Sequence, residues 1–406
     1  MPPRRRALII GGSIGGLFAG HLLQRAGWDV AIFERSAGDL ADRGAGLGIS
    51  AELFEVMRRV GLTVGPALAF HVRSSAWLTP GGSIGGEIPR GWHGSAWSII
   101  YQPLRASFPS ALYCAGKMLA RVEQDGDGVT AIFADGTRER GDLLIAADGI
   151  YSTVRRQLLP QVEPVSAGYI AWRGMLDEKD LPTDARALLL ERAAFSFPER
   201  ELVVSLPLPG ANNDLRPGHR RYYFIWYRPA SPERQAALFT DASGRRHGLS
   251  IPPPLIRPEF VAEMKAAARR DLPPPISAVV ERAAQPLLQS ISDLEAPQLV
   301  FGRIALLGDS AFVARPHVAA GTTKAALDAA GLVDALAAHE GDLDAALAQY
   351  QRERIVFGRA LIAHARYLGA YLEAQSSPSD ASLRDPEQVL REYGAPHLVH
   401  DVVDFD

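Results

Sequence analysis

A glycine-rich turn near the N-terminus is the first feature whose residue types and spacing could do chemistry. Residues 11–16 read GGSIGG and follow the short apolar run ALII at 7–10. A buried strand, a turn with glycines at this spacing and a following helix form the fingerprint that binds the pyrophosphate of a dinucleotide at a helix N-terminus. Gly11 makes the tight turn, and Gly16 lets the helix pack closely on the strand. Ser13 replaces the usual middle glycine, and we expect its small side chain to be tolerated there.

An acidic residue ends the second strand of the same unit. Residues 29–33 (DVAIF) are a predicted strand that leads into Glu34 and Arg35. A carboxylate at this place accepts hydrogen bonds from ribose hydroxyls and repels a 2′-phosphate. The sequence therefore predicts FAD or NAD, rather than NADP, as the bound dinucleotide. The alternative is a glycine-rich turn in an unrelated α/β protein.

Two later apolar strands also end in an acid. Residues 141–149 read GDLLIAADG, and residues 302–309 read GRIALLGD. An acid just past the end of a parallel strand points into the crevice where such sheets bind ligands. Either Asp148 or Asp309 alone could instead be a helix N-cap. Both acids, together with the fingerprint upstream, indicate one shared binding crevice.

Together these motifs resemble the FAD-dependent aromatic hydroxylases of the para-hydroxybenzoate hydroxylase class, over roughly residues 5–370. The resemblance implies that the fingerprint binds the ADP half of FAD. It places Asp148 near the pyrophosphate, where it serves both FAD and the nicotinamide nucleotide, and Asp309 at the ribityl chain. The FAD-binding residues predicted in this way are Gly11, Ser13, Ile14, Gly16, Glu34, Arg35, Arg43, Val122, Asp148, Gly149, Asp309, Pro316, Gly321, Thr322 and Thr323.

The family likeness also predicts a substrate side. The loop 43–49 (RGAGLGI) would bring Arg43 to the FAD phosphates and ribityl chain, while Leu47 and Ile49 would line the substrate pocket. The alternative for Arg43 is a solvated loop arginine. Tyr227, at the end of an aromatic run, is a further candidate for the pocket wall. We expect most of the neighbouring aromatic residues to be core.

His317 is the imidazole that the motif places beside the flavin. It could hold a ring hydroxyl of the substrate or take its proton; the alternative is a histidine that only packs or bonds to backbone. A helix is expected to begin near Gly321 or Thr322. In the family this N-terminus points at the flavin, and its partial positive charge would favour the reduced, anionic form. The other histidines show no ligand spacing, so we predict no metal site.

Residues around this helix indicate a branch of the family. Most members carry His at the place of Phe312 and Asn at the place of Thr323. The segment RPHVAAG at 315–321, the opening GGSI, the segment AGYIAWRG at 167–174 and Tyr101 are instead similar to the branch that hydroxylates 2,6-dihydroxypyridine. This likeness implies a hydroxypyridine as substrate.

The implied activity is that of a monooxygenase. NADH or NADPH would reduce bound FAD, and O₂ would then hydroxylate an electron-rich, hydroxylated ring through a flavin C4a-hydroperoxide. The alternatives are the same chemistry on a phenol, an indole or a purine such as urate, and a non-hydroxylating flavin reductase of the same fold. A protein that binds FAD or NAD without turnover is a third alternative.

The elements that must position these residues form an α/β protein of two units. The chain has 406 residues, and this length is more than one hydrophobic core usually supports. Its composition, 47% hydrophobic and 22% charged, is that of an ordinary folded protein. We expect a Rossmann-like FAD-binding domain, a mostly antiparallel β-sheet substrate domain, and C-terminal helices. The FAD-binding domain would comprise residues 1–73, 101–165 and 285–375, the substrate domain 74–100 and 166–284, and a loosely attached tail 376–406. We also expect strands at 169–176, 202–208 and 222–227, a helix at 259–270, and loops at 206–220 and 229–258.

Composition excludes several classes of protein. Cys114 is the single cysteine, so neither an internal disulfide framework nor a cysteine-rich zinc site can form. A net charge of −3 without a basic block argues against nucleic-acid binding. No apolar run approaches the roughly 20 residues that span a bilayer, and the run after Arg6 is too short for an export signal. We therefore expect a cytoplasmic protein whose partners are a small aromatic molecule, O₂ and NAD(P)H, and which can form a homodimer.

Overall fold

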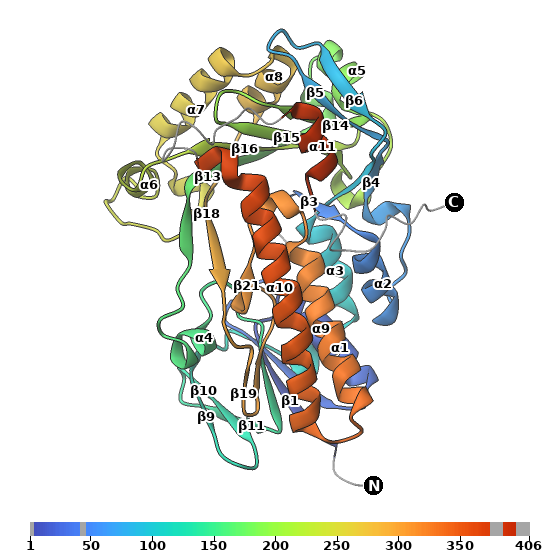
Figure 1. The fold of residues 1–406 in the computed structure, drawn as a ribbon, viewed down its shortest axis with the longest axis vertical. Coiled ribbons are helices and arrows are strands. Elements are labelled where there is room, and N and C mark those ends of the chain that lie inside the picture. Colours follow the sequence, from blue (N-terminus) through green and yellow to red (C-terminus); the bar gives the residue numbers. More distant parts are fainter. Residues whose placement is uncertain (1–3, 41–45, 374–384, 395–406) are drawn as a thin grey trace.

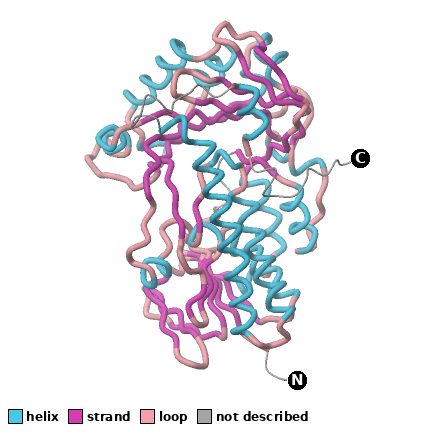
Figure 2. Tube along the Cα trace, viewed as in Figure 1, coloured by secondary structure: helices cyan, strands magenta, loops and turns pink. Residues whose placement is uncertain are grey.

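Most strands belong to two main sheets, which lie at opposite ends of an elongated molecule. Figure 2 shows these sheets as two groups of magenta strands. The computed structural model describes residues 4–40, 46–373 and 385–394. Two long helices, α9 (Gly321–Ala338) and α10 (Leu343–Glu373), run side by side along the molecule (Figure 1), and α10 contacts strands of both sheets. No helix in these described ranges has the length and apolarity to cross a membrane.

The first sheet has the predicted Rossmann-like arrangement. Its strand order is β19-β20-β12-β1-β2-β8, and β1 pairs in parallel with both β2 and β12. The central strands are apolar and buried along most of their length, from Ala7 to Ile10 in β1 and over all of β12, as expected for a sheet that is covered on both faces. A three-stranded antiparallel sheet, β9-β10-β11, lies beside it. The elements are β1 (Arg6–Ile10), α1 (Ile14–Arg25), β2 (Asp29–Glu34), β8 (Tyr113–Ala115), β9 (Leu119–Gln124), β10 (Val129–Phe133), β11 (Arg138–Gly141), β12 (Leu143–Ala146), β19 (Val300–Phe301) and β20 (Ile304–Leu306).

The second sheet is antiparallel apart from the β14–β5 pair, in agreement with the prediction. Its main order is β17-β18-β13-β16-β15-β14-β5-β6, and β21 extends β18. The predicted strand at 222–227 is β16, which is buried on both faces. The strands are β5 (Ser74–Leu78), β6 (Ile84–Ile88), β13 (Val165–Asp177), β14 (Arg192–Ser196), β15 (Leu202–Leu208), β16 (Arg221–Pro229), β17 (Ser250–Ile251), β18 (Leu287–Glu295) and β21 (Phe312–Val313).

Helices cover the outer face of this sheet, with a core of aromatic and aliphatic side chains between them. The helix predicted at 259–270 is α7, which Pro258 opens at a position where its missing N–H costs nothing. The prediction of a loop throughout 229–258 was wrong, because α6 forms there with Ser231 as its N-cap and Pro232 in its first turn. These helices are α5 (Thr183–Leu189), α6 (Pro232–Leu238), α7 (Pro258–Asp271) and α8 (Pro274–Arg282).

Smaller elements join the two ends. A three-stranded sheet in the order β3-β7-β4 lies between them, and α2, α3 and α4 pack around the first sheet. Two short 3₁₀ helices, η6 and η7, follow β20. The bounds are β3 (Gly46–Ile49), α2 (Ala51–Arg59), β4 (Phe70–Val72), β7 (Trp92–Ala96), α3 (Trp97–Ser107), α4 (Thr153–Leu158), η6 (Gly308–Ser310) and η7 (Pro316–Val318).

The C-terminal residues 385–394 are not loosely attached, contrary to our expectation for 376–406. They form α11 (Pro386–Glu392), which contacts β5 and β6. Val389, Leu390 and Tyr393 are buried. The Arg90 side chain donates hydrogen bonds to the carbonyl oxygens of Leu390 and Arg391. This segment is therefore part of the fold.

The predicted division into domains stays a proposal. One strand bears on its boundary: β18 is an internal strand of the antiparallel sheet and pairs with both β13 and β17. The predicted division placed residues 285–375 with the FAD-binding domain. We therefore propose that β18 belongs with the substrate domain instead.

Candidate active site

A cavity of about 400 Å³ lies between the two main sheets. Its floor consists of the turns that follow β1, β12 and β20, together with the first turn of α9. Its roof is the inner face of the antiparallel sheet, and β3, Trp92, Trp97 and Tyr393 contribute to its sides. The floor and the roof hold different kinds of groups, which are described in turn.

The glycine-rich turn on the floor has almost no room for side chains. Gly11 has a φ of +106°, and a Cβ there would lie 2.2 Å from the carbonyl oxygen of Ala147. A Cβ at Gly16 would lie 1.9 Å from the carbonyl oxygen of Gly11. Ser13 is the N-cap of α1, its side chain makes no capping hydrogen bond, and both it and Ile14 line the cavity. The N-terminus of α1 therefore opens onto the floor, which is suited to an anion.

Glu34 lies buried at the end of β2, beside this turn. One of its carboxylate oxygens accepts a hydrogen bond from the Gly12 N–H at 2.8 Å, and the other accepts from the Ser36 N–H, also at 2.8 Å. Each oxygen keeps a second lone pair, so the group can still accept from a hydroxyl. The neighbouring Arg35 side chain is exposed and is not part of the cavity wall.

Asp148 bonds to the start of α4, whose N-cap is Ser152. Its Oδ2 accepts hydrogen bonds from the N–H groups of Thr153 (2.7 Å) and Val154 (3.4 Å), at the start of α4. Its Oδ1 is buried and has no hydrogen-bond partner among the described residues. Burial raises the pKa of this carboxyl, and the hydrogen bonds oppose that rise. Gly149, with φ +79°, lines the cavity next to it.

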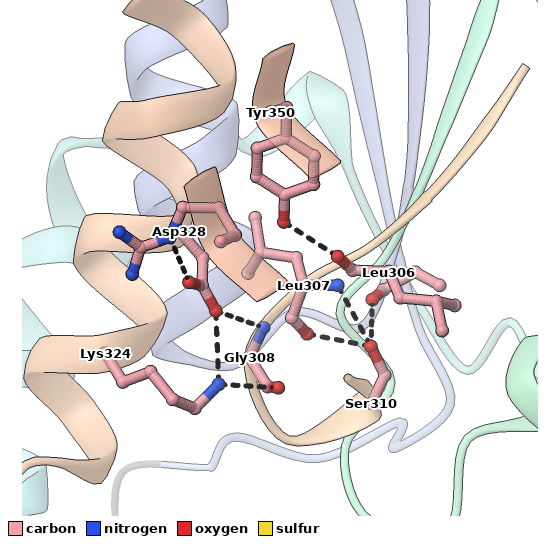
Figure 3. A network of polar contacts seen from close by, with 9 residues as sticks. Leu306, Leu307, Gly308, Ser310, Lys324, Asp328 and Tyr350 are labelled. Carbon is pink, nitrogen blue, oxygen red and sulfur yellow. Dashed lines mark hydrogen bonds and ion pairs between the residues drawn. The ribbon is translucent and has the colours of Figure 1, made fainter. Parts of the chain in front are cut away.

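A buried ionic network holds the turn at Gly308 (Figure 3). The Asp328 carboxylate accepts from the Gly308 N–H at 3.1 Å, and the Lys324 ammonium donates to the Gly308 carbonyl oxygen at 2.7 Å. Lys324 and Asp328 also pair with each other at 3.1 Å, and Arg354 of α10 donates to the other oxygen of Asp328 at 2.8 Å. Two helices thus fix both backbone groups of one glycine.

The charges in this network depend on one another. Burial by itself would raise the pKa of Asp328, but Lys324 and Arg354 overcome this and hold the pKa below its ordinary value. The end of the adjacent strand β20 is fixed as well (Figure 3). The Tyr350 hydroxyl donates a hydrogen bond to the Leu306 carbonyl oxygen at 2.7 Å, and the Ser310 hydroxyl donates one to the Leu307 carbonyl oxygen at 2.8 Å.

Asp309 follows Gly308 in this fixed turn and lines the cavity. The side chain is accessible from the open cavity while protein surrounds it on its other sides. This surrounding protein raises the pKa of its carboxyl, and the nearby Lys324 ammonium opposes the rise. An acceptor for ligand hydroxyls therefore stands on the floor.

Helix α9 begins at Gly321, as predicted. Pro316, Gly321 and Thr322 line the cavity, and a Cβ at Gly321 would meet no described protein atom within 4 Å. Thr323 is buried instead, and its hydroxyl lies 3.2 Å from that of Ser50. The free N–H groups of the first helical turn and an open space beside them therefore face the cavity.

Four further residues predicted for the site differ in their position relative to the cavity wall. Leu47 lines the cavity, whereas Ile49 is buried outside the wall. The backbone N–H and C=O of Val122 are both bonded to the side-chain amide of Gln157, at 2.9 and 2.7 Å, so they are already occupied. Arg43 lies outside the described residues.

His317 does not reach the cavity wall. Its side chain is fully buried, its Nε2 lies 2.7 Å from the Tyr169 hydroxyl, and its ring packs on that of Tyr227 with centroids 4.3 Å apart. Its carbonyl oxygen accepts from the Gly394 N–H at 2.8 Å. The geometry therefore does not support the predicted direct substrate contact. The His317 ring instead packs behind Tyr227, which does line the cavity.

Tyr393 is a wall residue that sequence reasoning missed. It follows α11, lines the cavity, and its hydroxyl lies 3.3 Å from that of Tyr227. Its ring also contacts those of Trp92 and Phe195 edge-on. No local motif marks it, because the contacts that bring it to the cavity are all distant in sequence.

The register of the antiparallel sheet determines the roof. Alternate residues of one strand face the same side, so Tyr223, Ile225 and Tyr227 of β16 point into the cavity together. Arg173 of β13 lies directly opposite Ile225, and Gln289 of β18 lies opposite Ala171. Arg173 was also missed, although it stands in the segment 167–174 singled out from the sequence.

The comparisons with known proteins agree with this geometry. Residues 4–66 match the family described as FAD binding domain, and residues 166–293 match the one described as FAD binding domain-like. The chain is 29% identical over 376 residues to a 2,6-dihydroxypyridine 3-monooxygenase of Paenarthrobacter nicotinovorans, which covers 92% of each chain. It is 27% identical to a 6-hydroxynicotinate 3-monooxygenase of Bordetella bronchiseptica, over 82% of each.

Solved structures show the same architecture. The structure of 2,6-dihydroxypyridine-3-hydroxylase from Arthrobacter nicotinovorans superposes with a TM-score of 0.86 at 28% identity, covering 93% of this chain and 96% of that one. A Klebsiella pneumoniae protein complexed with FAD and uric acid has a TM-score of 0.73 at 23% identity, covering 96% and 94%, and so shares the fold. Among the described residues, no cluster of three or more His, Cys, Asp or Glu side chains could hold a metal ion.

Proposed function

As an FAD-dependent aromatic monooxygenase, this chain hydroxylates an aromatic ring, and we propose that the ring is a hydroxypyridine such as 2,6-dihydroxypyridine. NADH is the proposed reductant. The observation that carries the substrate proposal is the likeness to the Paenarthrobacter enzyme, which extends over 92% of both chains. The likeness therefore includes both the floor and the roof of the cavity.

The floor fits FAD on features of this chain alone. The N-terminus of α1 is open to the cavity at Ser13, and the carboxylate of Asp148 keeps one buried oxygen without a partner among the described residues. The space beside Gly149 and Gly321 would be filled by a Cβ but holds no described protein atom within 4 Å. A pyrophosphate, hydroxyl groups and a flat ring system can be accommodated by such a surface.

Residue roles follow from this fit. The turn from Gly11 to Gly16 would hold the pyrophosphate, Glu34 would hold the adenosine ribose, and Asp309 would hold the ribityl hydroxyls. The N–H groups at Gly321 and Thr322, together with Pro316 and Ile14, line the part of the cavity that would hold the flavin ring. The side chains of Arg35, Val122 and Thr323 do not line the cavity, and the backbone N–H and C=O of Val122 are bonded to Gln157, so we assign these three residues no direct contact with FAD. When bound, FAD supplies the electron transfer and the activation of oxygen.

The roof supplies the substrate side. Burial raises the pKa values of Tyr223 and Tyr227, so both phenols stay protonated at neutral pH and can donate hydrogen bonds to a ring hydroxyl. Val204, Leu206 and Ile225 surround them with apolar surface that excludes water. Exclusion of water matters because it protects a reactive intermediate from side reactions.

The test is to follow NADH loss in air by the purified, FAD-loaded protein, with and without 2,6-dihydroxypyridine, while measuring H₂O₂. We expect substrate-stimulated NADH oxidation, little peroxide and a hydroxylated pyridine product. Absence of stimulation would contradict the hydroxypyridine assignment. Peroxide equal to the NADH consumed would contradict hydroxylation of this compound.

A further inference from the structure

The inner face of the roof carries a single cationic side chain. Five adjacent strands contribute residues that face the cavity, and Arg173 is the charged one among them. The others are apolar or neutral: Ala193, Val204, Leu206, Tyr223, Ile225, Tyr227 and Gln289. The register confirms that they share one face, since Arg173 lies opposite Ile225, which in turn lies opposite Val204. Arg173 therefore stands near the middle of the roof, between apolar surface and two phenols.

No carboxylate in the described part of the chain forms an ion pair with Arg173, and its Nε is buried without a hydrogen-bond partner there. The neighbouring groups on which its charge acts are neutral phenols: the guanidinium lowers the pKa of Tyr223 and of Tyr227, while burial, the larger effect, raises both. Arg315, the other arginine on the wall, differs in this respect. It is buried in a bidentate pair with Asp293, at 3.0 and 2.8 Å.

A half-buried guanidinium without an anionic partner is unfavourable, and a bound anion would remove that cost. The planar guanidinium matches a carboxylate in two parallel hydrogen bonds and also accepts a single oxyanion. Asp309, the acidic residue on the wall, lies across the cavity on the floor. The roof is thus the electropositive side of the cavity, where an anionic oxygen on a ring would be held.

We propose that Arg173 is a specificity-determining residue that selects substrates bearing an anionic oxygen on the ring, either an ionised ring hydroxyl or a ring carboxylate. This inference rests on the proposed function in taking an aromatic ring as the ligand. It does not depend on which ring is hydroxylated, or on whether oxygen transfer succeeds. Tyr223 and Tyr227, which flank Arg173, would donate further hydrogen bonds to the same oxygen.

Binding to the oxidised holoenzyme tests the proposal without turnover. Two pairs of probes of matched size are titrated, and the change in the absorption of bound FAD reports binding. Ionised 4-nitrophenol is compared with neutral 4-nitroaniline, at a pH where the phenol is ionised, and benzoate is compared with benzamide. The first pair reports a ring oxyanion and the second a ring carboxylate.

We expect the protein to bind at least one anion about tenfold or more tightly than its neutral partner, which corresponds to about 1.4 kcal/mol. Arg173→Gln should abolish this preference, and Arg173→Lys should restore part of it. Arg221→Gln is the matched control, because Arg221 lies on the neighbouring strand β16 outside the cavity wall, and the preference should survive there.

Each result decides the question. Equal or undetectable binding of both members in both pairs would overturn the proposal, as would a preference that persists in Arg173→Gln. The FAD content and circular dichroism of each variant establish that it is folded. If the anion preference is present but 2,6-dihydroxypyridine is not hydroxylated, the proposed substrate fails and this inference stands.

Discussion

The floor and the roof of the cavity achieve binding by different means. The floor uses backbone: glycines with positive φ, free N–H groups at two helix ends, and carbonyl groups fixed by a buried ionic network. The roof uses side chains projected from alternate positions of antiparallel strands, with Tyr393 added from the C-terminal segment. Floor residues should therefore tolerate almost no change, whereas roof residues should tolerate substitutions that alter the ligand preference.

The largest effect is expected where the floor depends on a buried charge. Asp328→Ala would leave the buried Lys324 and Arg354 without their carboxylate and release the Gly308 N–H. Loss of one partner of a buried pair costs about 3–5 kcal/mol. We expect that decrease in the free energy of unfolding, measured by urea denaturation, and loss of FAD. Asp334→Ala, at an exposed ion pair with Arg59, is the control and should change stability by less than about 1 kcal/mol. An equal loss in both variants would contradict the role of the network.

The glycine turn should respond next most strongly. In Gly16→Ala, the new methyl group would have to displace the Gly11 carbonyl. Overpacking of this kind lowers the free energy of unfolding by about 1–3 kcal/mol. The protein should fold but be purified without yellow colour. Gly38→Ala is the control, since a Cβ there meets no described atom within 4 Å. Normal FAD content in Gly16→Ala would show that the turn is not part of the FAD site.

Asp309→Ala separates binding from folding on the floor. The side chain reaches the open cavity and contributes little to the surrounding packing. We expect stability of the FAD-free protein to stay within about 0.5 kcal/mol, while FAD affinity falls at least about tenfold, as loss of a charged hydrogen bond worth about 1.5–3 kcal/mol implies. Equilibrium dialysis of FAD measures this. Full retention of affinity would refute the proposed ribityl contact.

The smallest effect is expected on the roof. Tyr393→Phe removes a hydroxyl that lies 3.3 Å from that of Tyr227, while the ring contacts remain. FAD content should be unchanged. We expect KM for the substrate to rise by roughly 3- to 10-fold, from a hydrogen bond worth about 0.5–1.5 kcal/mol, with more NADH diverted to H₂O₂. A loss of FAD in this variant would contradict the division between floor and roof.

The contrast between floor and roof also explains what the sequence could reveal. The β1–α1–β2 unit, Asp148, Asp309 and the start of α9 were predictable, because each depends on a short stretch in which strand, turn and helix signals are adjacent. The wall position of Arg173 depends on the pairing of β13 with β16, and that of Tyr393 on contacts between segments far apart in sequence. Single-sequence patterns carry no such information.

Two expectations differ from the structure for local physical reasons. His317 was placed by motif, but the motif fixes the backbone path and not the direction of the side chain, which turns away to Tyr169. Helix α6 was missed inside a proline- and arginine-rich stretch. The pair Ser231 and Pro232, an N-cap followed by proline in the first turn, was a readable start signal.

The most direct test of the central claim is to run the reaction with 2,6-dihydroxypyridine and NADH under isotopically labelled O₂ and to measure the mass of the product by mass spectrometry. If the cavity joins an FAD floor to a substrate roof as described, the pyridine product gains one labelled oxygen atom in a new ring hydroxyl. A product without the label, or label recovered only in H₂O₂ and water, would contradict the account.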